Sequence, residues 1–455
     1  MSDTPALARL PSVDEVLRHP AFAAAAGGLA DAYRTRLVRQ TIQTRRRRLL
    51  DDPPADGADV RADVVADCAR EARALARPFP RRVINATGVL LHTNLGRAPL
   101  GELLAGLEDT LGGYTDLEWD EATLGRGNRD EGLAAQLRLL TGAESAIVVN
   151  NCASALLLAL HTLAAGRAAL VSRSELVEIG GSFRVPEIIE ASGCRLREVG
   201  TTNRTRAADF ERAATDGGAA VLLKVHQSNF VQRGFVESVS TDEMVALGRA
   251  LGVPVLEDNG SGLVVPNGAP PLGDEPHVAA SVARGVDVVC FSGDKLLGGV
   301  QAGIVVGRAP LVDAMRRNPL FRALRLDKVR IALLHRCLAP HLAGDERGLP
   351  LWRLFHADVD EVRARASTLR LPSWARPVPL RATLGGGSNP EADFPSWGLE
   401  LAHPTLGAER VRRALAGRDV PIVGYVRQDR CFLDVRTVLP ADLPEIQAAL
   451  DTLDR

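Results

Sequence analysis

One lysine of this sequence stands where an amine could do covalent chemistry. The chain has 55 basic residues, and only Lys224, Lys295 and Lys328 are lysines. Lys295 belongs to VDVVCFSGDKLLGGVQAGIVVG, a glycine-rich loop between two apolar, β-branched runs. In an open α/β sheet, loops at the carboxyl ends of strands form the ligand crevice. Taken alone, the loop fits either a lysine that forms a Schiff base with pyridoxal phosphate or a surface lysine in a turn.

Two further patterns favour the Schiff-base lysine. The strand-like run VPVLED ends at Asp258, and a pyridoxal enzyme needs a carboxylate against the pyridine nitrogen. AIVVNNCASALLLALH predicts a strand, a polar turn and a helix, whose N-terminus could hold a phosphate. The three patterns together predict a fold-type-I pyridoxal phosphate enzyme. The expected phosphate contacts are the turn residues and a serine three positions before the lysine: Asn150, Asn151, Cys152 and Ser292.

The remaining candidates near this chemistry are less specific. Lys224, near the end of the strand-like AVLLKVH, is the second choice for the Schiff base. His226 could contact the cofactor or be an ordinary core histidine. Lys328 lies in a basic helical stretch, where it would bind an anion or face solvent. Asp294 adjoins Lys295 and could relay protons.

Arginines are concentrated at a few places in the chain. Guanidinium groups bind oxyanions in a bidentate way, but a surface salt bridge explains any single one equally well. The spacing of Arg322 and Arg325 predicts one shared helical face. As a set, the clusters indicate a substrate with more negative charge than an amino acid. The residues concerned are Arg97, Arg126, Arg129, Arg322 and Arg325.

The elements that must position these residues fall into three predicted domains. Residues 1–78 form a helical domain with a linker, and Ser12 with Glu15 has the spacing of a capping box. Residues 79–340 alternate strand-like and helical stretches, which predicts a mostly parallel sheet. Residues 341–455 predict a smaller α+β domain with an antiparallel sheet, in which Gly385 to Gly387 form a turn rather than a phosphate cradle.

Composition limits the classes of function. Hydrophobic residues make up 46% and the net charge is −1, which excludes a disordered chain and a global polycation. The six cysteines are scattered without a Cys-x-x-Cys pair, so we expect free thiols and no metal site. The sequence shows no signal peptide and no apolar run near the roughly 20 residues of a membrane span. We therefore expect a cytoplasmic protein.

Several long motifs identify a resemblance. RRVINATGVLLHTNLGRAPL, VVNNCAS, SRSELVEIGGSFRVPEI, EVGTTNRT, KVHQSN, FSGDKLLGGVQAGIVVG and NPLFRALRLDK resemble bacterial selenocysteine synthases, the L-seryl-tRNA(Sec) selenium transferases. The resemblance covers nearly the whole chain. Two positions depart from the family pattern: Cys152 stands where asparagine is common, and Asn259 follows Asp258 where an apolar residue is usual. Neither departure removes a group assigned to chemistry.

The resemblance implies an activity and its partners. The family converts seryl-tRNA(Sec) to selenocysteinyl-tRNA(Sec) with selenophosphate and pyridoxal phosphate, through an aminoacrylyl form of the substrate. It implies Lys295 as the cofactor lysine, and Arg97, Arg322 and Arg325 as ligands of selenophosphate. Thr201 and Thr202, in Gly-Thr-Thr-Asn-Arg-Thr, would approach a neighbouring subunit's active site in a ring of ten subunits. The family's N-terminal domain binds the tRNA.

Within that domain, one stretch is the densest positive run in the chain. Seven arginines and no acid lie between positions 32 and 50, including Arg45, Arg46, Arg47 and Arg48. These four arginines are the predicted tRNA contact, against the alternative of a solvated amphipathic helix.

The sequence leaves two competing functions to be tested. A pyridoxal phosphate lyase of a free amino acid or amino sugar acid would share the cofactor site, but would not need a tRNA-binding domain. A non-catalytic RNA-binding scaffold would not need Lys295 and Asp258.

Overall fold

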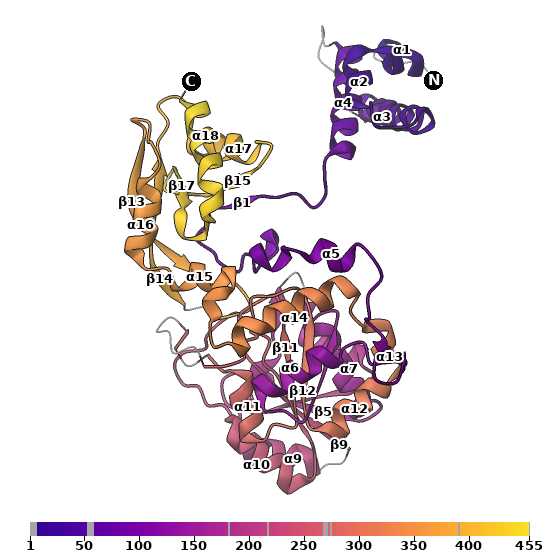
Figure 1. Cartoon of the computed structure of the whole chain (residues 1–455), viewed down its shortest axis with the longest axis vertical. Helices are drawn as coiled ribbons and strands as arrows, with labels where there is room; N and C mark the ends of the chain where they lie inside the picture. The colour runs from indigo at the N-terminus through magenta and orange to yellow at the C-terminus, as the bar shows by residue number, and fades with distance from the viewer. Residues whose placement is uncertain are drawn as a thin grey trace. The chain divides into compact units, whose positions relative to one another are not determined.

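The computed structural model describes residues 7–51, 59–180, 183–215, 218–266, 272–273, 275–389 and 392–454. The chain forms two compact units, residues 1–82 and residues 83–455 (Figure 1). Each unit has its own apolar core.

The first unit is helical, and its core is a single apolar cluster. Ser12 and Glu15 form the predicted capping box at the first helix: each side chain accepts a hydrogen bond from the other's backbone N–H. Val38 and Ile42 of the longest helix pack with Val64 and Cys68 of the last one. The four helices are α1 (Val13–Arg18), α2 (Pro20–Ala25), α3 (Asp31–Asp51) and α4 (Val60–Ala76).

A seven-stranded sheet is the centre of the second unit. Its order is β4-β12-β11-β10-β9-β5-β8, and every pairing is parallel except the two made by β12. Since consecutive side chains of a strand point to opposite faces, a sheet buried on both sides needs continuous apolar strands. The strands are β4 (Ser145–Val149), β5 (Ala168–Ser172), β8 (Arg195–Val199), β9 (Ala219–Val225), β10 (Val255–Asp258), β11 (Val288–Ser292) and β12 (Gly303–Gly307).

Helices cover both faces of this sheet. Val289 and Phe291 of β11 belong to one apolar cluster, whereas Val288 and Cys290 belong to the other. The first cluster takes residues from α6 (Glu131–Thr141), α9 (Ala207–Thr215), α10 (Thr241–Leu251), α11 (Val278–Arg284) and α14 (Lys328–Leu342). The second takes residues from α7 (Cys152–Ala164), α8 (Val185–Ala191) and α12 (Ala309–Arg317). Short helices α5 (Leu107–Leu111), α13 (Pro319–Leu324) and α15 (Pro350–His356) complete this region.

The C-terminal part contains an antiparallel sheet with the order β13-β14-β17-β16. Leu399 of β14 and Leu433 of β17 pack with α17 and α18 in one apolar cluster. The strands are β13 (Ala375–Thr383), β14 (Asp393–Leu401), β16 (Tyr425–Arg427) and β17 (Arg430–Asp434), and the helices are α16 (Val359–Ser367), α17 (Ala408–Ala416) and α18 (Leu443–Leu453). Two-stranded pairs join β1 (Ile84–Asn85) with β15 (Ile422–Val423), β2 (Trp119–Asp120) with β3 (Gly125–Arg126), and β6 (Glu178–Gly180) with β7 (Phe183–Arg184).

The predicted fold class is confirmed: a mostly parallel sheet lies between helices, with an N-terminal helical part and a C-terminal antiparallel sheet. The boundary expected near residue 340 stays a prediction. All six cysteines are free thiols. Among the described residues, no helix has both the length and the apolar content to cross a membrane.

Candidate active site

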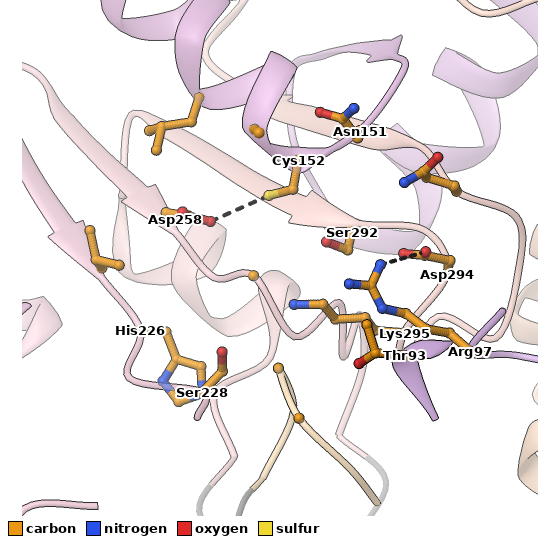
Figure 2. Close-up of a pocket in the computed structure, with 17 residues that line it drawn as sticks. Thr93, Arg97, Asn151, Cys152, His226, Ser228, Asp258, Ser292, Asp294 and Lys295 are labelled. Carbon is orange, nitrogen blue, oxygen red and sulfur yellow. Dashed lines mark hydrogen bonds and ion pairs between the residues drawn. The ribbon is translucent and has the colours of Figure 1, made fainter. Parts of the chain in front are cut away.

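A cavity of about 330 Å³ lies where β9, β10 and β11 end. Figure 2 shows the Lys295 amine directed into this cavity, with Asp258 and His226 on its walls. Strand ends, the first turn of α7 and several connecting segments line it. The polar lining residues are Thr93, Arg97, Asn151, Cys152, His226, Ser228, Asp258, Ser292, Asp294, Lys295 and Gln301.

Lys295 is almost completely buried, at 5% exposed. Burial lowers the pKa of its ammonium, since desolvation penalises the charged form. The side chain has room because residue 387 is glycine: a Cβ there would lie 2.6 Å from the Lys295 Nζ atom. Gly387 has a φ of +84°, a region that also favours glycine. The amine is therefore held in the cavity with an increased neutral fraction.

Asp258, at the end of β10, is the buried acid of the cavity, with 4% exposure. Its Oδ1 atom accepts a hydrogen bond from the Cys152 thiol at 3.4 Å (Figure 2). Desolvation raises the pKa of Asp258, and burial keeps the Cys152 thiol protonated by raising its pKa well above the usual value. A buried carboxylate is costly unless a cation compensates it. The position therefore fits a positively charged ring nitrogen.

The first turn of α7 forms another wall. The Asn151 side chain accepts a hydrogen bond from the Ser154 N–H at 2.8 Å, so it acts as the helix cap. The backbone N–H groups of Cys152 and Ala153 lie in the first turn of α7, where they have no carbonyl partner within the helix. They can therefore bind an anion. Gly303 permits close packing here, because a Cβ would collide with the Asn151 carbonyl. Ser292 adds a buried hydroxyl.

Arg97 and Asp294 form an ion pair at the cavity, with 2.7 Å between the Arg97 Nη1 and Asp294 Oδ2 atoms. Arg97 has a φ of +60°, which is uncommon for a residue other than glycine and typical of functional sites. Its buried Nε atom has no hydrogen-bond partner among the described residues. Asp294 thus orients a guanidinium that keeps donor capacity for an anion.

The other candidates around β9 have protein partners. The Lys224 ammonium donates to the Val239 carbonyl at 2.8 Å and pairs with Glu175 at 3.4 Å. It does not line the cavity, which leaves Lys295 as the only lysine on its described walls. His226 does line it, and its Nε2 atom lies 3.0 Å from the Glu275 Oε1 atom.

A second, more open cavity collects most of the predicted anion-binding arginines. Arg126, Arg129, Arg322, Arg325 and Lys328 line it together with Glu118. It shares no lining residue with the Lys295 cavity: Arg97 lines that cavity, whereas Arg322 and Arg325 line this one. Lys328 donates to the carbonyls of Leu111 and Gly113.

The prediction that Arg322 and Arg325 share a helical face is wrong. The helix α13 ends at Leu324, and Arg325 is extended, with ψ near 147°. Arg325 instead forms a β-bridge with Val149, while Asp327 caps the next helix. The chain bends between the two arginines, and both side chains line the same cavity.

Three predicted groups lie outside both cavities. Asn150 accepts a hydrogen bond from Arg330 at 3.4 Å. Thr201 borders a separate surface hollow beside Arg204, and the Thr202 carbonyl accepts from Gln232. Arg45 pairs with Asp63 at 2.5 Å and with Asp67 at 3.7 Å, whereas Arg46, Arg47 and Arg48 are exposed.

Sequence reasoning missed part of the wall. Gly386 and Gly387 form the predicted turn, but the turn also closes the Lys295 cavity. Three consecutive glycines were the available signal, and only the fold shows that they face a lysine. Thr93 and Ser228 carry no comparable signal.

The residues present fit pyridoxal phosphate. A buried amine, a buried carboxylate and a helix N-terminus meet in one cavity of about 330 Å³, near the lower limit of small-molecule pockets. Without a cationic partner, Asp258 would keep its desolvation penalty.

Comparison with known proteins gives consistent matches. A family model described as "L-seryl-tRNA selenium transferase" matches residues 83–439, and one described as "Selenocysteine synthase N terminal" matches residues 7–46. The chain is 44% identical to an L-seryl-tRNA(Sec) selenium transferase of Moorella thermoacetica over 98% of this chain and 96% of that protein. It is 42% identical to the protein of that name in Geobacter sulfurreducens, over 98% of each.

Among solved structures, a D-glucosaminate-6-phosphate ammonia-lyase matches with a TM-score of 0.59 and 20% identity. The match covers 84% of this chain and 97% of that one. At this identity, it supports the fold alone.

Proposed function

Because this chain belongs to the L-seryl-tRNA selenium transferase family, we propose that the Lys295 cavity is where it converts L-seryl-tRNA(Sec) to L-selenocysteinyl-tRNA(Sec). The chain is an enzyme of selenocysteine synthesis. The observation that carries the site assignment is the buried Lys295 amine, which shares a described cavity with Asp258 and no other lysine.

Pyridoxal phosphate is the proposed cofactor. Lys295 would hold its aldehyde carbon, Asp258 its ring nitrogen, and the N-terminus of α7 with Ser292 its phosphate. When bound, the cofactor supplies an electron sink for the α carbon of the seryl group. Cys152 fixes the orientation of the Asp258 carboxylate through its thiol. His226 lies on the same wall, held by Glu275.

The proton chemistry is assigned to the lysine. Once its amine is free, Lys295 takes the proton from the α carbon of the seryl group. The lowered pKa of Lys295 favours the neutral, basic form that this step requires. The serine hydroxyl would then leave as water, and the β carbon would bond to the selenium of selenophosphate. Hydrolysis of the Se–P bond would release phosphate, and Lys295 would return a proton to the α carbon. Asp294 contributes by orienting Arg97, and need not relay a proton itself.

Selenophosphate requires cationic ligands. Arg97 supplies one at the Lys295 cavity, and its free Nε atom supports this role. Arg126, Arg129, Arg322 and Arg325 form a second anion site in the neighbouring open cavity. Guanidinium groups suit such an oxyanion because they offer paired donors.

The tRNA-binding surface is assigned to the first unit. Arg46, Arg47 and Arg48 of α3 are exposed and available for phosphates, whereas Arg45 is committed to Asp63 and Asp67. The match of residues 7–46 to the selenocysteine synthase N-terminal family supports this assignment.

The assembly and location belong to the same proposal. The chain forms a homo-oligomer, a ring of ten, in which Thr201 and Thr202 lie near a neighbour's site. It works in the cytoplasm, where aminoacylated tRNA is available. Light scattering of the purified protein would measure the subunit number.

Reconstitution tests the function. Purified protein with pyridoxal phosphate, seryl-tRNA(Sec) and selenophosphate should form selenocysteinyl-tRNA(Sec). Free serine and D-glucosaminate 6-phosphate, offered in parallel, should not be consumed. Turnover of a free amino acid or sugar acid without transfer to tRNA would assign the chain to the lyase alternative.

A further inference from the structure

In the open cavity, one carboxylate lies among the cations. The Glu118 Oε1 atom accepts hydrogen bonds from the Nε and Nη2 atoms of Arg129, at 2.9 and 2.7 Å. Its other oxygen lies 3.1 Å from the Arg126 Nη2 atom, and Arg325 reaches Oε1 at 3.4 Å. Three guanidinium groups therefore converge on a single carboxylate, the arrangement that an oxyanion ligand would take.

Three residues of the cluster have anchors that do not depend on Glu118. Arg129 also donates to the Leu326 carbonyl at 2.8 Å. The backbone of Arg325 forms the bridge with Val149. Lys328 is tied to two carbonyls of the preceding loop. Removing the carboxylate would thus leave Arg129 and Lys328 held by backbone carbonyls and the chain at Arg325 held by its bridge.

Apart from the arginines, the contact shown for Glu118 is made by its backbone. Its carbonyl accepts the Gly127 N–H at 3.0 Å, next to the β2–β3 pair. The side chain is 28% exposed, so solvent reaches the carboxylate within the cluster. Arg129 and the neighbouring arginines lower the pKa of Glu118, so the carboxylate stays charged at neutral pH. Glu118 and Arg129 are partly exposed, so solvent screening reduces the contribution of their ion pair, and a multiply charged ligand can replace it.

We propose that Glu118 is an internal counter-ion of the arginine cluster, which a phosphate-like substrate anion displaces on binding. The inference rests on the proposed anion site and adds a residue that sets its affinity and selectivity. A weak or singly charged anion does not displace Glu118, whereas a dianion that contacts several guanidinium groups does. Before substrate binds, the carboxylate also reduces electrostatic repulsion among the cations.

Calorimetric titration of the cofactor-loaded protein with inorganic phosphate tests this inference. Glu118→Gln keeps the size of the side chain and removes its charge. Its phosphate dissociation constant should fall about fivefold, the worth of one exposed ion pair. Glu102→Gln is the matched control, since Glu102 pairs with Arg353 away from the cavity, and its phosphate affinity should not change.

Arg325→Ala separates the possible failures. In the wild type, this change should weaken phosphate binding, and in the Glu118→Gln background it should cancel the gain. Unchanged or weaker phosphate binding by Glu118→Gln, with Arg325→Ala still harmful, would overturn the counter-ion role alone. Phosphate binding that is insensitive to Arg325→Ala and Arg322→Ala would overturn the anion site, and the role of Glu118 with it.

Discussion

The Lys295 cavity and the open arginine cavity hold their charges differently. In the first, Lys295 and Asp258 are almost fully buried, and desolvation shifts the pKa of each. In the second, the Arg126 side chain is 73% exposed, and several cations share one carboxylate. The buried lysine and the buried acid each act alone, whereas several exposed or partly exposed arginines share the binding of one anion. The expected effects of substitution therefore differ in size.

Lys295→Ala should have the largest effect. Activity should fall by at least about 10³-fold, because both the amine that holds the cofactor and the base are removed. The visible absorbance of bound pyridoxal phosphate should disappear, while circular dichroism should show an intact fold.

Lys224→Ala is the matched control for that experiment. Visible absorbance should persist, but the free energy of unfolding should fall by about 1–3 kcal/mol, because Glu175 would lose its buried partner. The reverse pattern of absorbance in these two variants would move the cofactor to Lys224.

Asp258→Asn should reduce kcat by about 10²-fold, because a preorganised charge in a dry site is lost.

Asp258→Asn should also change the pH dependence of stability in the cofactor-free protein. Burial raises the pKa of Asp258 above its ordinary 3.8, so the folded state binds this proton more tightly than the unfolded chain. As the pH rises from the ordinary pKa of 3.8 towards the higher pKa of the folded state, the wild type should lose stability relative to Asp258→Asn. Urea unfolding at several pH values would measure this, and a parallel pH dependence would contradict the buried-acid assignment.

Arg325→Ala should raise the KM for selenophosphate about tenfold and change kcat less, because one of several charge-assisted hydrogen bonds is removed. Initial rates at varied selenophosphate and fixed seryl-tRNA(Sec) give the two constants. Arg322→Ala is expected to act in the same direction. If the variant and the wild type have the same KM for selenophosphate but the variant binds tRNA more weakly, the cavity would be assigned to tRNA binding.

Replacing Arg46, Arg47 and Arg48 with glutamine should weaken tRNA binding and flatten its salt dependence. The slope should decrease by about one for each tRNA phosphate that an arginine no longer neutralises. Arg45→Gln should have the smallest effect on tRNA affinity, since Asp63 and Asp67 already hold that side chain. Filter binding across a salt series measures both. An equal decrease in affinity for Arg45→Gln and for the triple variant would show that accessibility of the arginines does not matter.

Apolar runs in the sequence predicted six strands of the central sheet, at 146–149, 168–172, 220–225, 253–258, 286–292 and 303–307. Continuous runs such as AIVV and GIVVG are typical of strands buried on both faces. The sequence did not predict β8, whose residues RLREV contain three charged residues among five. β8 is an edge strand, which needs only one pairing partner and tolerates charge.

The site was predictable where one residue type carries the chemistry. Lys295 and Asp258 follow strands, and their type and position indicate their roles. Gly387 lies on the turn between β13 and β14, distant in sequence, and only tertiary packing brings it against the Lys295 amine. The helical spacing of Arg322 and Arg325 was misleading because the helix ends between them. Local periodicity cannot report where tertiary contacts end a helix.

Borohydride reduction of the cofactor-loaded protein, followed by peptide mass spectrometry, tests the central assignment most directly. Reduction fixes a lysine-bound pyridoxal phosphate irreversibly, and the chain has only three lysines. We predict that the added mass is found on the peptide containing Lys295 and on no other. Labelling of Lys224 or Lys328, or the absence of labelled peptide from a protein that makes selenocysteinyl-tRNA(Sec), would contradict the assignment.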